Sequence, residues 1–93
     1  MIVGVMQVDL SIPDARSLKD KRRVVLSLKQ RIRNRFNVSV AEVETENTIR
    51  RCKLAIGMVS NASRPIHSQL DKIVELIRAT RDLILLEYER ELW

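Results

Sequence analysis

The spacing of apolar residues is the feature that most constrains the fold of this chain. In two segments they recur with helical spacing, and each of these lies between two segments in which apolar residues alternate. The alternating segments are 1–11, 36–44, 50–60 and 83–93, and the helical ones are 17–36 and a segment starting at Ser63. Two strand–helix–strand halves with right-handed crossovers predict an α+β, ferredoxin-like βαββαβ fold. We expect one domain over residues 1–93, with a four-stranded antiparallel sheet and both helices on one face.

The strand patterns also predict which side chains share a face. In the first strand the even-numbered residues are expected to face the core. The second strand changes phase after Val40, which indicates a bulge or a change of exposed face. In the last strand one face is expected to carry Ile84, Leu86, Tyr88 and Leu92, and the other Glu87, Glu89 and Glu91.

Local signals mark where each helix begins. Ser17 is a good N-cap, and Asp20 three residues later resembles the second half of a capping box. Ser63 is expected to cap the second helix, with Pro65 in its first turn. The apolar stripe of the first helix consists of Leu18, Val24, Val25, Leu28 and Ile32, and Lys21 falls inside this stripe.

Charge is concentrated in the first helix. Residues 17–36 hold eight Lys or Arg and one Asp, a local charge of +7, so the rest of this +5 chain sums to −2. The helical wheel gathers Lys19, Arg22, Arg23, Lys29 and Arg33 into one arc around Leu26, along about 20 Å of helix. Such an arc suits the phosphate backbone of RNA. Arg50 and Arg51 extend it if the second hairpin lies beside the helix.

Two other interpretations of the arc stay open. The cations could bind an acidic protein, or they could pair with strand carboxylates and keep a small protein in solution.

The sheet face without helices is predicted to be partly apolar, at Val3, Val5, Ala55 and Val59. A half-apolar open face is typical of an interface, most simply a homodimer, and the alternative is a hydrated face with scattered aliphatic residues.

Catalytic chemistry has little support in the sequence. His67 has Asp71 four residues on, but no nucleophile or metal ligand is spaced to join them, so we interpret them as a helix-surface contact. Cys52 lies between Arg51 and Lys53 and is expected to be an inert strand residue. The carboxylates of residues 42, 44, 46, 87, 89 and 91 are more typical of Lys and Arg partners than of a cation site. We therefore expect a non-enzymatic protein with no catalytic residue, metal site or cofactor.

Two functions known for small folds of this kind can also be compared with the sequence. An acylphosphatase-like hydrolase is the enzymatic alternative, but the loop before the first helix offers Arg16 without the glycine-rich sequence of a phosphate cradle. An RRM-type domain is excluded in its standard form, because the third strand lacks the Gly-aromatic pattern.

The expected location is the cytoplasm. The chain has a single cysteine, and it contains neither an apolar run long enough to cross a membrane nor a signal-like leader, so we expect no membrane partner.

Three phrases resemble a known family. Ile12-Pro13, the segment 17–22 (SLKDKR) and the segment 35–43 (RFNVSVAEV) are similar to the signature of the YlxP-like family of small bacterial proteins of unknown function. The resemblance implies a ferredoxin-like fold, and because members are often encoded near translation-initiation and ribosome-maturation factors, it suggests a role around ribosomal RNA. Asn47-Thr48-Ile49 departs from the aspartate and bulky apolar pair expected there, which puts in doubt any role assigned to that hairpin.

The functional hypothesis is an RNA- or ribosome-associated binding protein whose first helix contacts phosphates. The alternative is a protein-binding assembly or regulatory module that acts through the open sheet face and has no nucleic-acid role.

Overall fold

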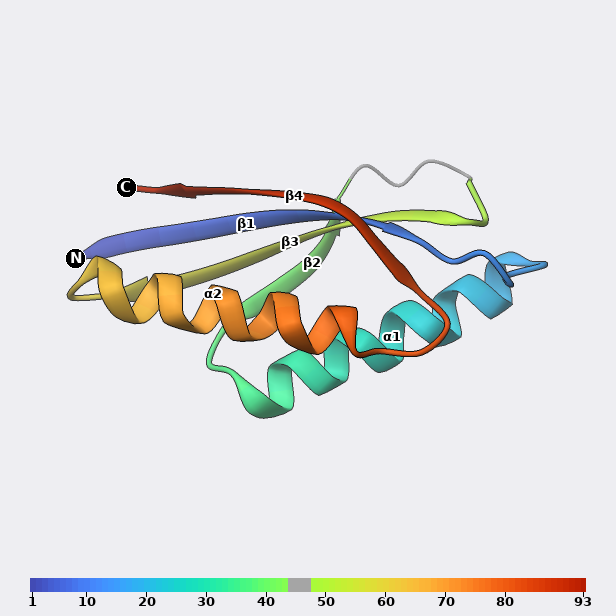
Figure 1. Ribbon diagram of the computed structural model, residues 1–93, viewed down its shortest axis with the longest axis horizontal. Coiled ribbons are helices and arrows are strands. Elements are labelled where there is room, and N and C mark those ends of the chain that lie inside the picture. The colour runs from blue at the N-terminus through green and yellow to red at the C-terminus, as the bar shows by residue number, and fades with distance from the viewer. Residues whose placement is uncertain (44–47) are drawn as a thin grey trace.

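The computed structural model describes residues 1–43 and 48–93 and has the expected order of elements. They are β1 (Ile2–Ser11), α1 (Leu18–Arg35), β2 (Ser39–Val43), β3 (Arg51–Ser60), α2 (Ser63–Arg78) and β4 (Ile84–Leu92). The four antiparallel strands lie in the order β2-β3-β1-β4, with both helices on one face (Figure 1). The predicted ferredoxin-like fold is confirmed.

The core lies between the helices and the sheet. Even-numbered residues of β1 and β3 point toward the helices, as the alternation predicted. The helices contribute one apolar stripe each, formed by Val25, Leu28 and Ile32 of α1 and by Ile66, Leu70, Ile73, Val74 and Ile77 of α2. The sheet contributes Met6, Val8, Leu10, Cys52, Leu54, Ile56 and Met58.

The predicted helix limits need two corrections. Phe36 does not begin the second strand, because its N–H bonds the Ile32 carbonyl at 2.9 Å and completes the last turn of α1. Ser63 is not the N-cap of α2. That position belongs to Ala62, whose side chain cannot accept a capping hydrogen bond, and Ser63 is the first helical residue.

Of the two alternatives predicted for the second strand, a bulge or a change of exposed face, the structure shows no bulge. β2 pairs with β3 without a break, and Ala41 and Val43 simply lie on the open face, so β2 is apolar on both sides. The irregularity lies between β1 and β4, where the register shifts after Asp9. Leu85 consequently pairs with Leu10 and packs on the core, and Leu86 becomes the extra residue.

This shift overturns part of the predicted face of the last strand. Ile84 and Leu86 were expected to share a face with Tyr88 and Leu92, but both are exposed. The acidic face is as predicted: Glu87, Glu89 and Glu91 are register partners of the open-face residues Asp9, Gln7 and Val5.

Candidate nucleic-acid interface

α1 begins where its sequence specifies. The Ser17 hydroxyl accepts a hydrogen bond from the Asp20 N–H at 3.1 Å, and the Asp20 carboxylate accepts one from the Arg16 N–H at 3.0 Å. An acidic side chain thus occupies the electropositive start of the helix. This is the place where a phosphate-binding loop would present its donors, so Asp20 competes with any anion there.

Three side chains near the start of α1 form an exposed basic surface. Lys19, Arg22 and Arg23 all point to solvent, and we call them the α1 basic surface. Within residues 1–43 and 48–93, no carboxylate forms an ion pair with any of them. Leu26 lies beside them with 52% of its surface exposed. None of the three cations therefore has an ion-pair partner among the described residues.

The remaining two residues of the predicted arc are placed differently. Arg33 donates from its guanidinium to the Val40 carbonyl at 2.7 Å and so ties the end of α1 to β2. Lys29 is half-buried on the same side. Both can still present charge to solvent, but Arg33 has a structural role that the wheel could not reveal, because its acceptor is a backbone atom of another element.

Arg50 and Arg51 lie on opposite sides of the sheet. Arg50 donates from Nε to the Ala15 carbonyl at 3.1 Å, which places it beside the loop that leads into α1. Arg51 pairs with Asp9 at 3.0 Å on the open face, away from the helices. Arg51 is the first residue of β3 and faces the open side, whereas Arg50 lies in the turn before the strand, so only Arg50 lies near the α1 basic surface.

Lys21 is the buried cation of α1. It retains only 6% exposure, donates from Nζ to the Thr48 carbonyl at 3.0 Å and lies 3.5 Å from a Glu42 carboxylate oxygen. The sequence placed Lys21 inside the apolar stripe of the first helix. What the sequence could not identify was Glu42 as its partner, because the two residues meet only when α1 packs on β2.

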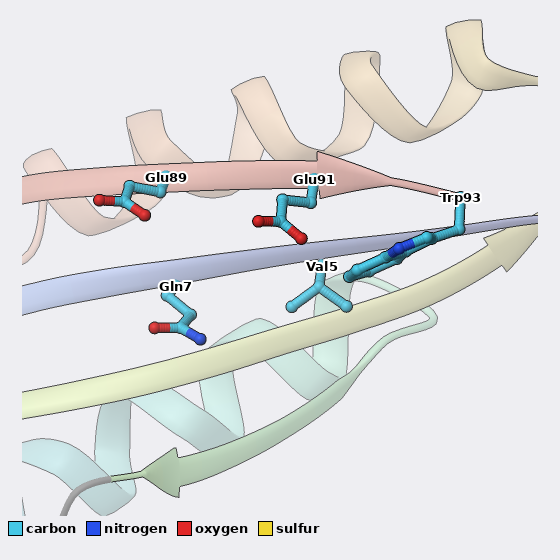
Figure 2. A pocket seen from close by; sticks show the side chains of 5 residues that line it. All are labelled: Val5, Gln7, Glu89, Glu91 and Trp93. Atoms are coloured by element: carbon cyan, nitrogen blue, oxygen red, sulfur yellow. The ribbon is translucent and has the colours of Figure 1, made fainter.

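The open sheet face has one apolar and one charged end. Val3, Val5 and Ala55 are half-buried by their strand neighbours, whereas Val59 is 61% exposed. Sequence reasoning missed Trp93, which pairs with Val3 through two 2.8 Å backbone bonds and is 65% exposed. Figure 2 shows the Trp93 ring reaching toward Val5, over a shallow hollow of about 80 Å³ that is lined by Val5, Gln7, Glu89, Glu91 and Trp93.

A larger cleft of about 430 Å³ lies beside the loop between β1 and α1. The lining is of mixed charge, with two arginines and three aspartates. The sequence did not predict this cleft, because Asp82 comes from the turn before β4, far along the chain from the other lining residues. The lining residues are Ile12, Asp14, Ala15, Arg16, Asp20, Arg23, Val24 and Asp82.

The other candidate reactive groups have structural partners. Arg90 donates to Asp71 at 2.9 Å and contacts Nδ1 of His67 at 3.3 Å, so a guanidinium joins the two residues that were expected to contact each other. Burial in the core raises the pKa of the Cys52 thiol to about 12, and the nearby Glu42 carboxylate adds to the shift. Such a thiol is protonated at neutral pH, which agrees with an inert strand residue.

Glu44 and Glu46 lie outside the described residues, as does Asn47 of the unusual hairpin phrase. In the part of the chain that is described, no three His, Cys, Asp or Glu side chains cluster as metal ligands would. Neither of the two described helices has a stretch long and apolar enough to cross a membrane.

Solved structures with similar folds agree with the topology. A de novo designed protein with ferredoxin fold, LFR1 1, matches with a TM-score of 0.56 and 13% identity over 99% of this chain and 85% of that one. The apo form of LarC2, the C-terminal domain of a cyclometallase involved in the synthesis of the NPN cofactor of lactate racemase, also matches. Its TM-score is 0.51 and its identity 8%, over 100% of this chain and 55% of that one. At these identities the similarity shows the fold alone.

Sequence comparisons identify the family. The model described as "Protein of unknown function (DUF503)" matches residues 3–90. The Uncharacterized protein YlxP of Bacillus subtilis (strain 168) is 32% identical over 76 residues, which cover 82% of this chain and 83% of that protein. The chain therefore belongs to the DUF503 family of proteins of unknown function and is a YlxP-like protein.

Proposed function

We propose that this protein is a non-enzymatic, cytoplasmic RNA- or ribosome-associated protein and that the α1 basic surface contacts phosphates. The observation that carries the proposal is the set of three exposed cations, Lys19, Arg22 and Arg23, with no carboxylate partner in the described part of the chain. Unpaired cations on one accessible surface are what a phosphate backbone binds, because each contact releases a condensed counterion.

The packing of α1 supports the same proposal. Contacts on its other sides hold the helix in place: Lys21 with Thr48, Arg31 with Thr80 at 3.1 Å, and Arg33 with Val40. The α1 basic surface is thus displayed on an element whose position is set by three bonds to the rest of the fold. Because the backbone of the helix is already fixed, binding has to order only the exposed side chains of these cations.

Leu26 is the apolar part of this surface. It lies one turn after Arg22 and Arg23 and is 52% exposed. An aliphatic side chain among cations can lie against sugar or base surfaces while the cations contact phosphates. Arg50 lies beside the same end of the helix. It can add a further phosphate contact if its guanidinium gives up the hydrogen bond to the Ala15 carbonyl and donates to a phosphate oxygen instead.

The test compares two variants of equal net charge. The first replaces Lys19, Arg22 and Arg23 with Gln. The control replaces Arg64, Lys72 and Arg81, exposed cations outside α1, so both variants change from +5 to +2. Their affinities for a fluorescent RNA duplex and for purified ribosomal RNA are measured over a range of salt concentrations.

Only the α1 variant is expected to lose most of its affinity. Its salt slope should fall by about 2 to 3, since each lost phosphate contact contributes about 0.9 to the slope for a B-form duplex. Equal losses in both variants would contradict the proposal, because net charge and not this surface would then explain binding. Arg33 is left unchanged because its bond to Val40 makes it a poor probe of binding.

We further propose that the open sheet face pairs with a second copy of the chain. The four strands hold 34 residues, which at about 3.3 Å per residue and about 4.8 Å between strands give roughly 540 Å² per face. A pair therefore buries roughly 1,100 Å², a little below the range of most stable interfaces. A two-fold axis between β1 and β3, parallel to the strands, sets Val3 opposite Val59 of the second copy and Asp9 opposite its Lys53. Exposed Val59 and Trp93 are the observations that favour this interface.

Sedimentation analysis tests this second proposal with Val59→Lys and the control Leu26→Lys, which changes an apolar residue of α1 that is also more than half exposed. We expect a weak dimer that dissociates in the first variant and persists in the control. A monomer at all concentrations would rule the homodimer out and leave the face to a different protein, as in the alternative of a protein-binding module. Salt separates the two interactions, since phosphate contacts weaken steeply with salt and apolar burial does not.

A further inference from the structure

The two edges of the sheet are protected to different degrees. β2, at one edge, has five residues, and the Arg33 guanidinium binds its Val40 carbonyl. β4, at the other edge, has nine residues, and in the described part of the chain no side chain binds its backbone. An open edge presents unpaired N–H and C=O groups on which another strand can form.

The outward-pointing backbone groups of β4 can be identified from its pairing. Trp93 and Val3 exchange two backbone hydrogen bonds, each 2.8 Å long, so both backbone groups of Trp93 point toward β1. Hydrogen-bonded and non-bonded pairs alternate along an antiparallel ladder, and the register is unbroken from Leu92 back to Glu87. Leu92, Arg90 and Tyr88 therefore direct their N–H and C=O groups away from the sheet.

Exposed apolar side chains gather along this edge. Ile84, Leu86 and Tyr88 are three of the eight large hydrophobic residues that the described chain exposes, and all three lie in β4. The bulge at Leu86 disturbs only the first part of the strand, so the regular stretch from Glu87 onward is the part available for pairing. A long, exposed edge with apolar side chains is the kind of edge that natural proteins usually cover.

Charge selects among the possible occupants. Glu87, Glu89 and Glu91 form a column on the open face of β4. If a second copy added its own β4, the two columns would lie side by side, and like charges on neighbouring strands destabilise pairing. A strand with Lys or Arg at every second position would instead place each cation beside a carboxylate.

The helix-facing side of β4 sets a second requirement. Here Tyr88 is flanked by two cations, with the guanidinium carbons of Arg78 and Arg90 at 5.9 and 5.8 Å from its ring centroid. Side chains of an added strand that point to this side meet an aromatic ring and positive charge. Uncharged apolar residues fit there, and cations do not.

We propose that β4 binds an extended segment of a partner protein by strand addition, and that this segment carries Lys or Arg at alternate positions with apolar residues between them. The bound segment forms main-chain hydrogen bonds to Tyr88 and Arg90 and ion pairs with the glutamate column. This interaction uses a different surface from the α1 basic surface, so it does not depend on RNA binding. The glutamate column is part of the open sheet face, so peptide binding is measured at protein concentrations at which the chain is a monomer.

The probe is a blocked seven-residue peptide of alternating Lys and Val. Binding is followed by the fluorescence of Trp93, the only tryptophan in the chain, and by protection of the Tyr88 and Arg90 amides from hydrogen exchange. Two backbone-methylated versions of the peptide keep every side chain, but each lacks alternate N–H groups. One of them is expected to lose binding at least tenfold and the other to retain it, because only one set of N–H groups faces β4.

Protein variants test the same contact from the other side. Arg90→Pro removes an outward N–H without removing a bond to β1, and Arg90→Ala controls for the lost side chain and its contact with Asp71. We expect at least tenfold weaker binding for Arg90→Pro than for Arg90→Ala. The variant E87Q/E89Q/E91Q, which leaves the backbone unchanged, should also bind the peptide at least tenfold more weakly, even if Arg90→Pro does not fold.

Three outcomes would overturn the proposal. The first is equal binding of the peptide and both methylated versions, which would indicate charge attraction alone. The second is unchanged peptide binding in the glutamine variant. The third is self-association without peptide that Arg90→Pro abolishes, because a second copy would then occupy the β4 edge.

Discussion

Replacing Gly4 with Ala tests how closely the helix layer packs on the sheet. Gly4 lies on the helix-facing side of β1, and a Cβ atom there would overlap the Cγ2 methyl of Ile66. Ile66 is fully buried in the first turn of α2 and cannot move into solvent. The other glycine, Gly57, is the matched control: it points to the open face, and its nearest neighbour would be the Gly4 carbonyl oxygen at 3.9 Å, an ordinary contact.

The expected magnitude follows from this pair. Each of the two Gly→Ala changes lowers the conformational entropy of the unfolded chain, which by itself stabilises the folded state by about 0.4–1 kcal/mol. Only Gly4→Ala adds overpacking, which costs about 1–3 kcal/mol. Because the first contribution is shared, the free energies of unfolding of the two variants should differ by about 1–3 kcal/mol, with Gly4→Ala the less stable.

Thermal unfolding followed by circular dichroism measures the difference. For a domain of this size each kcal/mol shifts Tm by about 4–8 °C. In an Ile66→Ala background the cost of Gly4→Ala should largely disappear, because the overlapping methyl is gone. Equal melting temperatures for Gly4→Ala and Gly57→Ala would refute the close approach of α2 to β1.

Three further changes probe single contacts. Lys21→Met should destabilise the fold by about 1.5–3 kcal/mol, since the Thr48 carbonyl loses a charged donor. In urea titrations the double variant Lys21→Met/Glu42→Leu should lose less free energy of unfolding than the sum of the losses in the two single variants. Cys52 should resist iodoacetamide in the folded protein between pH 8 and 10 but react in urea, because folding raises the pKa of its thiol from 9.0 to about 12. Between pH 9 and 12 only the unfolded thiol ionises, so the free energy of unfolding should fall as the pH rises through this range, and it should fall less in Cys52→Ala. Equal labelling of the folded and unfolded chains would disprove the burial of this thiol. Asp82 has a φ of 71°, a backbone conformation that Asn tolerates and a β-branched residue does not. Asp82→Val should therefore lower stability by about 1–2 kcal/mol, and Asp82→Asn should be nearly neutral. Equal unfolding temperatures for the two variants in a calorimetric scan would contradict this.

The fold was largely predictable because it follows from local periodicity. Alternation in β1 and β3 and the 3.6-residue spacing in α1 and α2 are each set by the geometry of one element. The predicted elements and their order are those of the structure, and Ser17 with Asp20 caps α1 as the sequence indicates. The errors lie at boundaries. The Phe36 N–H completes the last turn of α1, and α2 has Ala62 at its N-cap, without a side-chain capping bond, in place of Ser63.

The candidate site was less predictable because it depends on distances between elements. A helical wheel treats Arg22 and Arg33 alike, but Arg33 ends on a carbonyl of β2 while Arg22 points to solvent. The same limit applies to Lys21, whose partner Glu42 is distant in sequence. Neither contact can be predicted from the spacing of residues along one helix, because each joins α1 to β2.

The sequence by itself determined the sheet, the helix layer and the excess of positive charge on α1, because each depends on periodicity or composition within one segment. Tertiary structure decided which cations remain exposed, where the bulge shifts β4, and that Trp93 joins the open face beside Val3. These features arise from the register and packing of segments that meet only in the folded chain. A one-residue shift between β1 and β4 moves apolar side chains from the core to the edge, and only the pairing itself reveals it.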